Sequence, residues 1–276
     1  MTKLSVGFFG SDWFVIPILQ VLAANFEVVG VITTKGSPVA KHAQKDDIPV
    51  LTPGKLDENS LGVISTTPPR WNLIVVASYG KIIPKTILDI PKYGALNIHP
   101  SLLPKYRGPS PVPTTILNGD RETGVTIMRM DEKMDHGPVV CTKKIKLSGK
   151  EDLQELITKL FRVGAEALIE IIPGYIEGKV SLKEQNHKKA TYTKVLKKED
   201  GYFEINNPPS PEILDRMVRA YYPWPGVWTR FRQGSSGQAR IVKFHPGGLI
   251  QMEGKKPLPL KDFLNGYPDF PLKKFD

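Results

Sequence analysis

The chain has 276 residues, enough for one large domain or two smaller ones with a sizeable buried core. Its 40% hydrophobic and 24% charged residues are typical of a globular protein and argue against a disordered or fibrous chain. A single cysteine, Cys141, excludes an intrachain disulfide, and we interpret it as a small hydrophobic residue within a strand.

The net charge of +10 is unevenly distributed along the chain. Residues 181–276 hold 17 Lys and Arg against 10 Asp and Glu, so about two-thirds of the excess falls in the last third. A basic excess favours a polyanionic partner such as nucleic acid. A solvated basic surface would have the same composition, so charge alone leaves both interpretations open.

The first 14 residues are apolar but contain Asp12, and no small-residue cleavage site follows them. We therefore predict a first strand here and not a signal peptide. No uninterrupted apolar stretch approaches the roughly 18 residues that a membrane helix needs. Both features predict a cytoplasmic protein that does not enter a membrane.

The first half of the chain alternates β-rich runs with stretches suited to helices. After the first run, Ser11 and Asp12 are expected to cap a helix that carries Pro17 in its first turn. A longer helix is expected over residues 151–171, where apolar residues recur at helical spacing. The alternation predicts an open, mostly parallel α/β sheet with helices on both faces. The expected strands are 4–9, 27–33, 73–77, 94–99, 125–130 and 139–142.

The composition changes at about residue 178. Residues 179–196 are polar and lysine-rich without a clear period, which predicts a linker after an α/β domain of residues 1–178. Beyond the linker, short β-like pieces at 226–231 and 239–244 are separated by Gly and Pro clusters. We therefore predict a small β-rich domain over residues 197–276.

The residues with the clearest chemical potential lie near the fourth expected strand. No Gly-rich phosphate loop follows the first strand, and no Cys/His spacing indicates zinc. Asn97 and His99 are two apart on a strand, so their side chains share one face. Pro100 then ends the strand, which places the pair at a carboxyl end, where such sheets bind ligands. By itself, a lone histidine is more often a buried structural residue.

The surrounding residues resemble the signatures of the folate-dependent formyltransferases. The first signature runs Asn-x-His, Ser-Leu-Leu-Pro and then an Arg-Gly loop, and it occupies residues 97–108. The second is a Gly-Val-Thr strand, here starting at Gly124, followed by the Asp-x-Gly loop at 135–137. The resemblance implies a Rossmann-like formyltransferase sheet in which Asn97, His99 and Asp135 are the catalytic residues. His136 is interpreted as a loop residue that faces solvent.

By this resemblance, a formyl group moves from 10-formyltetrahydrofolate to an amine without a metal. His99 would transfer the proton and assist the developing oxyanion, which the amide of Asn97 would also bind. Asp135 would orient His99, directly or through a water. For Arg107, an exposed surface arginine is the alternative to a substrate contact. The implied folate-site residues are Ser101, Leu102, Leu103, Pro104, Val76, Tyr79 and Gly80, and the implied substrate contacts are Arg107, Lys35 and Lys41.

Within the family, the chain resembles the branch that formylates methionyl-tRNA for translation initiation. The resemblance covers nearly the whole chain and weakens after about residue 232. It includes the stretch at residues 219–226, of which Pro223–Gly226 is interpreted as a turn that holds an aromatic anchor for the small domain. It implies a monomer whose OB-like C-terminal barrel binds charged initiator tRNA.

Three features depart from that branch. Residues 35–48 are shorter than the basic insertion that the branch often carries, and Pro100 replaces a residue that is usually small. The chain also ends early for the branch, so we expect the small domain to be truncated. The short segment at residues 35–48 weakens the prediction that tRNA carries the acceptor amine. It leaves the predicted catalytic residues unchanged.

Three alternatives to methionyl-tRNA formylation remain at this stage. One is a formyltransferase that acts on an amino sugar nucleotide or another small amine, which would have no need of the basic C-terminal third. A second is an RNA-binding protein on an inactive fold, which the intact Asn-His-Asp set argues against. A third is a folate hydrolase that uses water as nucleophile.

Overall fold

The computed structural model describes residues 3–57, 71–234 and 238–272, and the chain divides into two compact units. The first unit comprises Met1–Pro111, Glu122–Lys146 and Ile157–Thr193. The second comprises Val112–Arg121, Leu147–Leu156 and Lys194–Asp276. Neither unit is therefore one continuous stretch of sequence.

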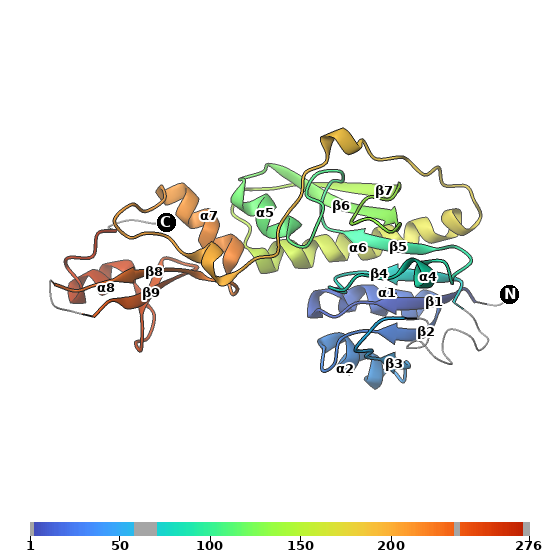
Figure 1. Cartoon of the computed structure of the whole chain (residues 1–276), viewed down its shortest axis with the longest axis horizontal. Helices are drawn as coiled ribbons and strands as arrows, with labels where there is room; N and C mark the ends of the chain where they lie inside the picture. Colours follow the sequence, from blue (N-terminus) through green and yellow to red (C-terminus); the bar gives the residue numbers. More distant parts are fainter. Residues whose placement is uncertain (1–2, 58–70, 235–237, 273–276) are drawn as a thin grey trace. The chain divides into compact units, whose positions relative to one another are not determined.

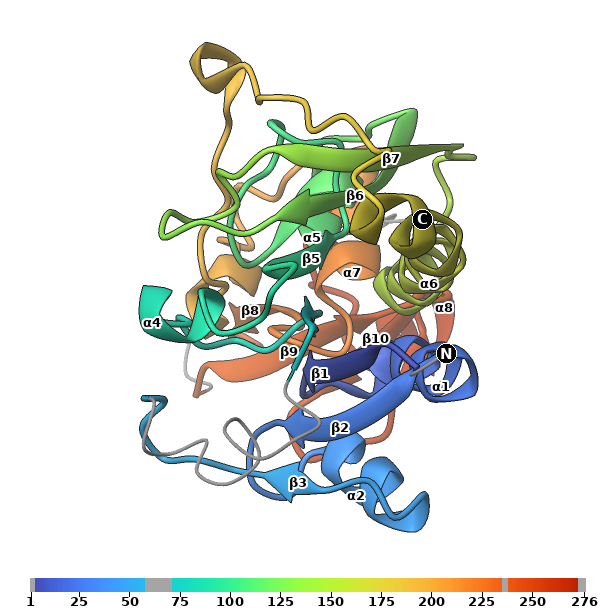
Figure 2. The ribbon, with the colours of Figure 1, turned by 90° about the vertical axis from the view of Figure 1, so that its right-hand side faces the viewer.

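A seven-stranded sheet of order β3-β2-β1-β4-β5-β6-β7 forms the centre of the first unit (Figures 1 and 2). Neighbouring strands from β3 to β5 pair in parallel, whereas β6 and β7 pair antiparallel. This confirms the expected open, mostly parallel α/β sheet. The strands are β1 (Ser5–Phe9), β2 (Glu27–Ile32), β3 (Val50–Leu51), β4 (Leu73–Val76), β5 (Ala95–His99), β6 (Glu122–Arg129) and β7 (Val139–Lys146).

Helices alternate with these strands, as predicted. Pro17 lies in the first turn of α1, but the carboxylate of Asp12 does not cap a helix. Asp12 instead accepts a hydrogen bond from the hydroxyl of Ser78 at 2.5 Å, so this capping prediction is wrong because a distant residue binds the carboxylate. The helices are α1 (Ile16–Asn25), α2 (Pro38–Lys45), α4 (Lys85–Leu88), α5 (Pro111–Leu117) and α6 (Leu153–Ile176).

The two faces of β5 have different neighbours. Gly164 of α6 lies against one face, where an added Cβ would stand 2.7 Å from Cγ2 of Ile98. Ala95 belongs to an apolar cluster on the opposite face. Because side chains alternate along a strand, Asn97 and His99 share the face of Ala95 and point away from α6.

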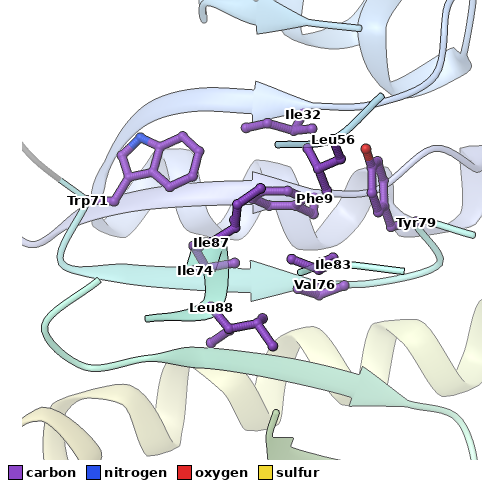
Figure 3. Close-up of a cluster of buried hydrophobic side chains, with 11 residues drawn as sticks. Phe9, Ile32, Leu56, Trp71, Ile74, Val76, Tyr79, Ile83, Ile87 and Leu88 are labelled. Carbon is purple, nitrogen blue, oxygen red and sulfur yellow. The ribbon is translucent and has the colours of Figure 1, made fainter. Parts of the chain in front are cut away.

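The apolar cluster supports the strand ends beside this face (Figure 3). The ring of Phe9 meets Trp71 edge-on at 5.8 Å between centroids and meets Tyr79 in the same way at 5.3 Å. Ile74 and Val76 of β4 pack into the same cluster. Edge-to-face contacts between buried rings each add roughly 0.5–1.5 kcal/mol beyond area burial, so the ends of β1 and β4 are firmly held.

The second unit contains a four-stranded antiparallel sheet of order β11-β10-β9-β8. Figure 1 shows β8 and β9 of this sheet side by side. One of its faces is apolar and buried, including Val242 and Phe244 of β9 and Ile250 of β10. This confirms a small β-rich C-terminal part. Its elements are α7 (Pro211–Tyr221), β8 (Val227–Phe231), β9 (Arg240–His245), β10 (Leu249–Met252), β11 (Leu258–Pro259) and α8 (Leu260–Gly266).

The turn at residues 222–226 does not anchor the small unit through its tryptophan. Trp224 is 57% exposed, whereas Tyr221, at the end of α7, is buried. The interpretation of Trp224 as an aromatic anchor is therefore wrong, because Tyr221 fills the interior position.

The segment expected to be a linker packs closely on the first unit as far as Thr193. Lys183 exchanges backbone hydrogen bonds with Val139, and Arg107 does so with Thr191 and Thr193. We call residues 183–193 the strap. The domain boundaries at 178 and 197 stay predictions. No helix in the described parts of the chain is long and apolar enough to span a membrane.

Candidate active site

His99 is held by contacts on both ring nitrogens. Its Nε2 lies 2.9 Å from the carbonyl oxygen of Tyr106, and its Nδ1 lies 3.6 Å from Oδ1 of Asp135. Because a carbonyl oxygen can only accept, Nε2 carries a hydrogen and donates it. In the neutral ring, Nδ1 is then the basic nitrogen, and it faces a carboxylate that can stabilise an acquired proton.

Asp135 connects all three predicted catalytic residues. Its Oδ1 accepts from Nδ2 of Asn97 at 3.4 Å, and its Oδ2 accepts from the backbone N–H of Gly108 at 2.6 Å. The structure therefore brings Asn97, His99 and Asp135 together, although 38 positions separate Asn97 from Asp135. The 3.4 Å bond is long and weak, so a substrate oxygen can compete for the Asn97 amide.

The backbone around this group is unusual at both contacts of His99. Asp135 has φ +48° and Tyr106 has φ +61°, a left-handed region that costs a non-glycine residue about 1–2 kcal/mol. Such conformations persist only where surrounding contacts fix them, and they cluster at functional sites. Strain at both partners of His99 supports the assignment of this group as the reactive centre.

Two glycines of the signatures have steric explanations. A Cβ on Gly137 would lie 1.9 Å from the carbonyl oxygen of Arg129, so the Asp-x-Gly loop can close against β6 only with glycine. Gly108 has φ +103°, and its Cβ would lie 2.8 Å from the carbonyl oxygen of Thr193 in the strap. Glycine at 108 therefore allows the loop to lie between Asp135 and the strap.

Thr126 explains the threonine of the Gly-Val-Thr signature. It pairs with His99 across β5 and β6, and its hydroxyl donates to the carbonyl oxygen of Ser101 at 2.7 Å. The same hydroxyl accepts from the backbone N–H of Leu103 at 3.1 Å. The predicted folate-site residues 101–104 are thus fixed directly beside His99, the predicted catalytic histidine.

The other predicted folate-site residues divide by burial. The side chains of Val76 and Tyr79 are buried in the apolar cluster, so only their backbone can line a ligand site, whereas Gly80 is exposed. Burial raises the pKa of the Tyr79 phenol. Its hydroxyl has no hydrogen-bond partner among the residues that the structure describes.

Arg107 is not a surface arginine. It is 1% exposed, so that alternative is wrong. Its Nε and Nη2 both donate to Oε1 of Gln185, at 3.2 and 2.7 Å, and Nη1 donates to the hydroxyl of Tyr192 at 3.2 Å. Arg107 therefore ties the signature loop to the strap, and a direct contact with substrate stays a prediction.

Gln185 is a site residue that the sequence did not reveal. It is buried, and its Nε2 donates to the carbonyl oxygens of Asp135 at 3.0 Å and Gly137 at 2.7 Å. Its Oε1 receives both bonds from Arg107. One side chain therefore connects the Arg-Gly loop with the Asp-x-Gly loop. No sequence signal marked it, because it lies in a polar stretch without periodicity.

Two histidines stack beside this connection. The rings of His136 and His187 are 4.0 Å apart and nearly parallel, and Nδ1 of His136 is 2.6 Å from Oδ2 of Asp131. His136 is thus partly exposed but held by Asp131 and the ring of His187, so it does not project freely into solvent as predicted. Nη2 of Arg107 donates to Nδ1 of His187 at 2.9 Å. Desolvation, then His136 and Arg107, lower the pKa of His187 below 6.5.

Lys35 and Lys41 are exposed, one before α2 and one within it. No interaction among the described residues joins either lysine to Asn97, His99 or Asp135. Their contact with substrate stays a prediction. In residues 3–57, 71–234 and 238–272, no three His, Cys, Asp or Glu side chains gather where they could hold a metal ion.

Known proteins share both the sequence and the fold of this chain. Residues 18–172 match the formyl transferase family. A methionyl-tRNA formyltransferase of Roseiflexus sp. (strain RS-1) is 37% identical over 95% of this chain and 92% of its own length. The chain belongs to the methionyl-tRNA formyltransferase family. Another member, from Chloroflexus aurantiacus, is 41% identical over 86% of this chain and 78% of its own length.

A solved structure supports the fold of this formyltransferase. A sugar N-formyltransferase from Shewanella sp. FDAARGOS_354 superposes with a TM-score of 0.69, covering 92% of this chain and 99% of that one. The two sequences are only 16% identical, so this likeness concerns the fold alone.

Proposed function

We propose that this formyltransferase moves the formyl group of 10-formyltetrahydrofolate to the free amino group of initiator methionyl-tRNA in the cytoplasm, as a monomer. The relatives named methionyl-tRNA formyltransferase match most of the chain at 34–41% identity, which supports the acceptor. The observation that carries the chemistry is the contact of Asp135 with both Asn97 and His99 at the end of β5.

The hydrogen-bond donor of Asn97 suits a reaction with an N-formyl folate. Such a donor supplies an electrophilic formyl carbon whose oxygen becomes negative when an amine attacks. The amide nitrogen of Asn97 has two hydrogens, one directed at Asp135, and the second can be donated to that oxygen. A fixed amide donor of this kind stabilises a developing oxyanion by roughly 2.7–4 kcal/mol in other enzymes.

His99 then accepts the proton that the attacking amine must lose. The Tyr106 carbonyl holds hydrogen on Nε2, which leaves Nδ1 with a lone pair. Once Nδ1 is protonated, its N–H can donate to Oδ1 of Asp135, which lies 3.6 Å away. The same proton can next be given to the departing folate nitrogen, so His99 acts first as base and then as acid.

One assay tests the acceptor. The protein is incubated with 10-formyltetrahydrofolate and charged initiator methionyl-tRNA, and formylmethionine is measured after the ester is hydrolysed. We expect turnover that falls steeply with added salt, because tRNA binding releases counterions. The absence of formylation at low salt would contradict the proposal.

The second candidate is formylation of an amino sugar nucleotide. The observation that favours it is the fold shared with sugar N-formyltransferases. A panel of amino sugar nucleotides in the same assay distinguishes the two, since a small acceptor should give turnover that depends little on salt. Turnover of a sugar nucleotide without turnover of methionyl-tRNA would replace the first candidate.

A further inference from the structure

The second unit presents exposed aromatic rings beside a cavity of about 410 Å³. Tyr222 is 41% exposed and Trp224 is 57% exposed, and both line the cavity. Its volume lies within the roughly 300–1,000 Å³ of small-ligand sites. Exposed tryptophan beside a hollow of this size indicates a surface built for recognition.

The opposite wall of the cavity is the outer face of the small sheet. Trp228, Lys243 and Gln251 stand side by side across β8, β9 and β10, because Lys243 pairs with both of the others. His245 lies two residues after Lys243 and so shares the same face. Alternation thus gives this sheet an apolar inner face and an outer face of aromatic, cationic and amide groups.

The acidic and amide groups of the cavity are bound to the protein itself. Oε2 of Glu253 accepts from the backbone N–H of Ile241 at 3.1 Å, and Gln251 binds His245 and the carbonyl oxygen of Lys255. Lys243, by contrast, has no ion pair within the part of the chain that the structure describes. The cavity therefore offers a ligand positive charge more than negative charge.

Of the three rings, Trp224 and Tyr222 are the ones open to a ligand. The ring of Trp228 is covered by the ammonium of Lys198 at 5.6 Å and by Tyr202 at 4.8 Å between centroids. Lys198 therefore places its charge over Trp228, and it lines the cavity together with Tyr222 and Trp224.

We infer that this cavity holds one unpaired nucleotide of the tRNA substrate, with the base against Trp224 and Tyr222 and the phosphate near Lys243 and Lys198. The inference rests on the proposed function. Exposed aromatic side chains next to cations are a usual means of binding single-stranded nucleotides, and here the turn before β8 supplies the rings while the sheet face supplies Lys243. The basic excess of residues 181–276 gives the charge complementarity that a polyanion needs.

The test measures the Kd of uncharged initiator tRNA for the full chain at several salt concentrations. Trp224→Ala should weaken binding about tenfold with the same slope of log Kd against log salt, because it removes stacking and no charge. Trp224→Phe, which keeps a stacking ring, should recover most of the affinity. Lys243→Ala should lower the slope by about one, because one phosphate contact is lost.

Two controls separate this inference from general damage and from the proposed function. Ile213→Ala, at another exposed apolar position of the second unit, should leave Kd unchanged. At saturating tRNA, kcat of Trp224→Ala should equal that of the wild type, and only KM for tRNA should rise. If the wild type binds tRNA tightly and Trp224→Ala leaves the Kd unchanged, the inferred nucleotide site in this cavity is wrong. The proposed function is not affected by that result.

Two further outcomes would also decide whether this cavity binds a nucleotide of the tRNA. A wild-type chain that neither binds nor formylates methionyl-tRNA overturns the proposed function and the pocket with it. If AMP binds to the wild type and Trp224→Ala abolishes that binding while the Kd for tRNA stays the same, the cavity serves a free nucleotide and the inference is wrong.

Discussion

The polar and aromatic side chains at the two sheets of this protein differ in whether other parts of the chain hold them in place. At the end of β5, every predicted catalytic side chain is fixed by a partner from another segment of the chain. In the second unit, Trp224 of the turn before β8 is exposed, and Lys243 of the small sheet has no ion pair within the described residues. Groups that move a proton must be held in one geometry before the substrate arrives, whereas groups that recognise a flexible polymer gain by staying accessible.

The largest expected effect comes from removing a catalytic side chain. His99→Ala or Asn97→Ala should lower kcat by about 10²–10³ or more, because each removes a group that acts in the transition state. Thermal unfolding should show that both variants remain folded. Near-normal turnover in either would remove that residue from the assignment, and an equal loss of kcat in Trp224→Ala would break the contrast between the two sheets.

Gly108→Ala should affect both activity and stability. The left-handed backbone costs alanine about 1–2 kcal/mol, and its Cβ would press on Thr193 and displace the N–H that binds Asp135. We expect kcat to fall about tenfold or more. Gly178→Ala is the matched control, because φ there is +72° with no atom within 4 Å of the added Cβ. Equal kcat values in the two variants would show that only backbone strain matters.

Gln185→Glu tests the connection between the two signature loops. Glutamate keeps an oxygen toward Arg107 but loses the donors to the carbonyl oxygens of Asp135 and Gly137. Two lost hydrogen bonds of about 0.5–1.5 kcal/mol each should lower kcat roughly tenfold. KM for tRNA should not change, since Gln185 is buried and its amide binds the backbone of Asp135 and Gly137.

Asn186→Asp is the control for Gln185→Glu, because it makes the same change of charge at an exposed neighbouring residue. It should leave kcat unchanged. If Gln185→Glu instead raised KM for tRNA and left kcat unchanged, the strap would contribute to tRNA binding. The contrast between a catalytic large sheet and a tRNA-binding small sheet would then be wrong.

The smallest expected effect is a pH dependence through His187. Its pKa is lowered from the ordinary value of histidine, so the neutral ring that accepts the bond from Arg107 is favoured in the folded protein. As the pH falls through the lowered pKa, protonation of Nδ1 breaks that bond. We expect an acid-side loss of kcat of about two- to threefold from this single contact.

His187→Phe isolates this effect, because phenylalanine keeps a ring against His136 and cannot titrate. The ratio of wild-type to variant kcat should be constant at neutral and higher pH and should fall as the pH drops through the lowered pKa of His187. A constant ratio over the whole range would remove His187 from the pH response.

Local sequence was enough to predict most of the first unit. Strands such as β1, β4 and β5 follow from short apolar runs, and the shared face of Asn97 and His99 follows from strand alternation. Asp135 was predicted from its place in the second of the two signatures, the Asp-x-Gly loop. The capping by Asp12 failed because its partner, Ser78, is 66 positions away and no local pattern reveals such a pairing.

The strap could not be predicted for a related reason. A lysine-rich segment without a hydrophobic period resembles a linker, because its contacts are polar ones, made by Gln185, His187, Tyr192 and backbone groups. The roles of Gln185 and His187 depend on which loops the fold brings to them. The exposure of Trp224 likewise depends on Tyr221 having filled the interior position.

The strap also sets the shortest chain that could be catalytically competent. A protein cut after residue 178 would retain Asn97, His99 and Asp135, and every strand of the large sheet. It would lack Gln185, and with it the only side chain of the described residues that binds both Arg107 and the backbone of Asp135. Anyone dividing this enzyme for separate expression should therefore keep the chain at least to Thr193, since an inactive shorter fragment would say nothing about whether the C-terminal sheet takes part in catalysis.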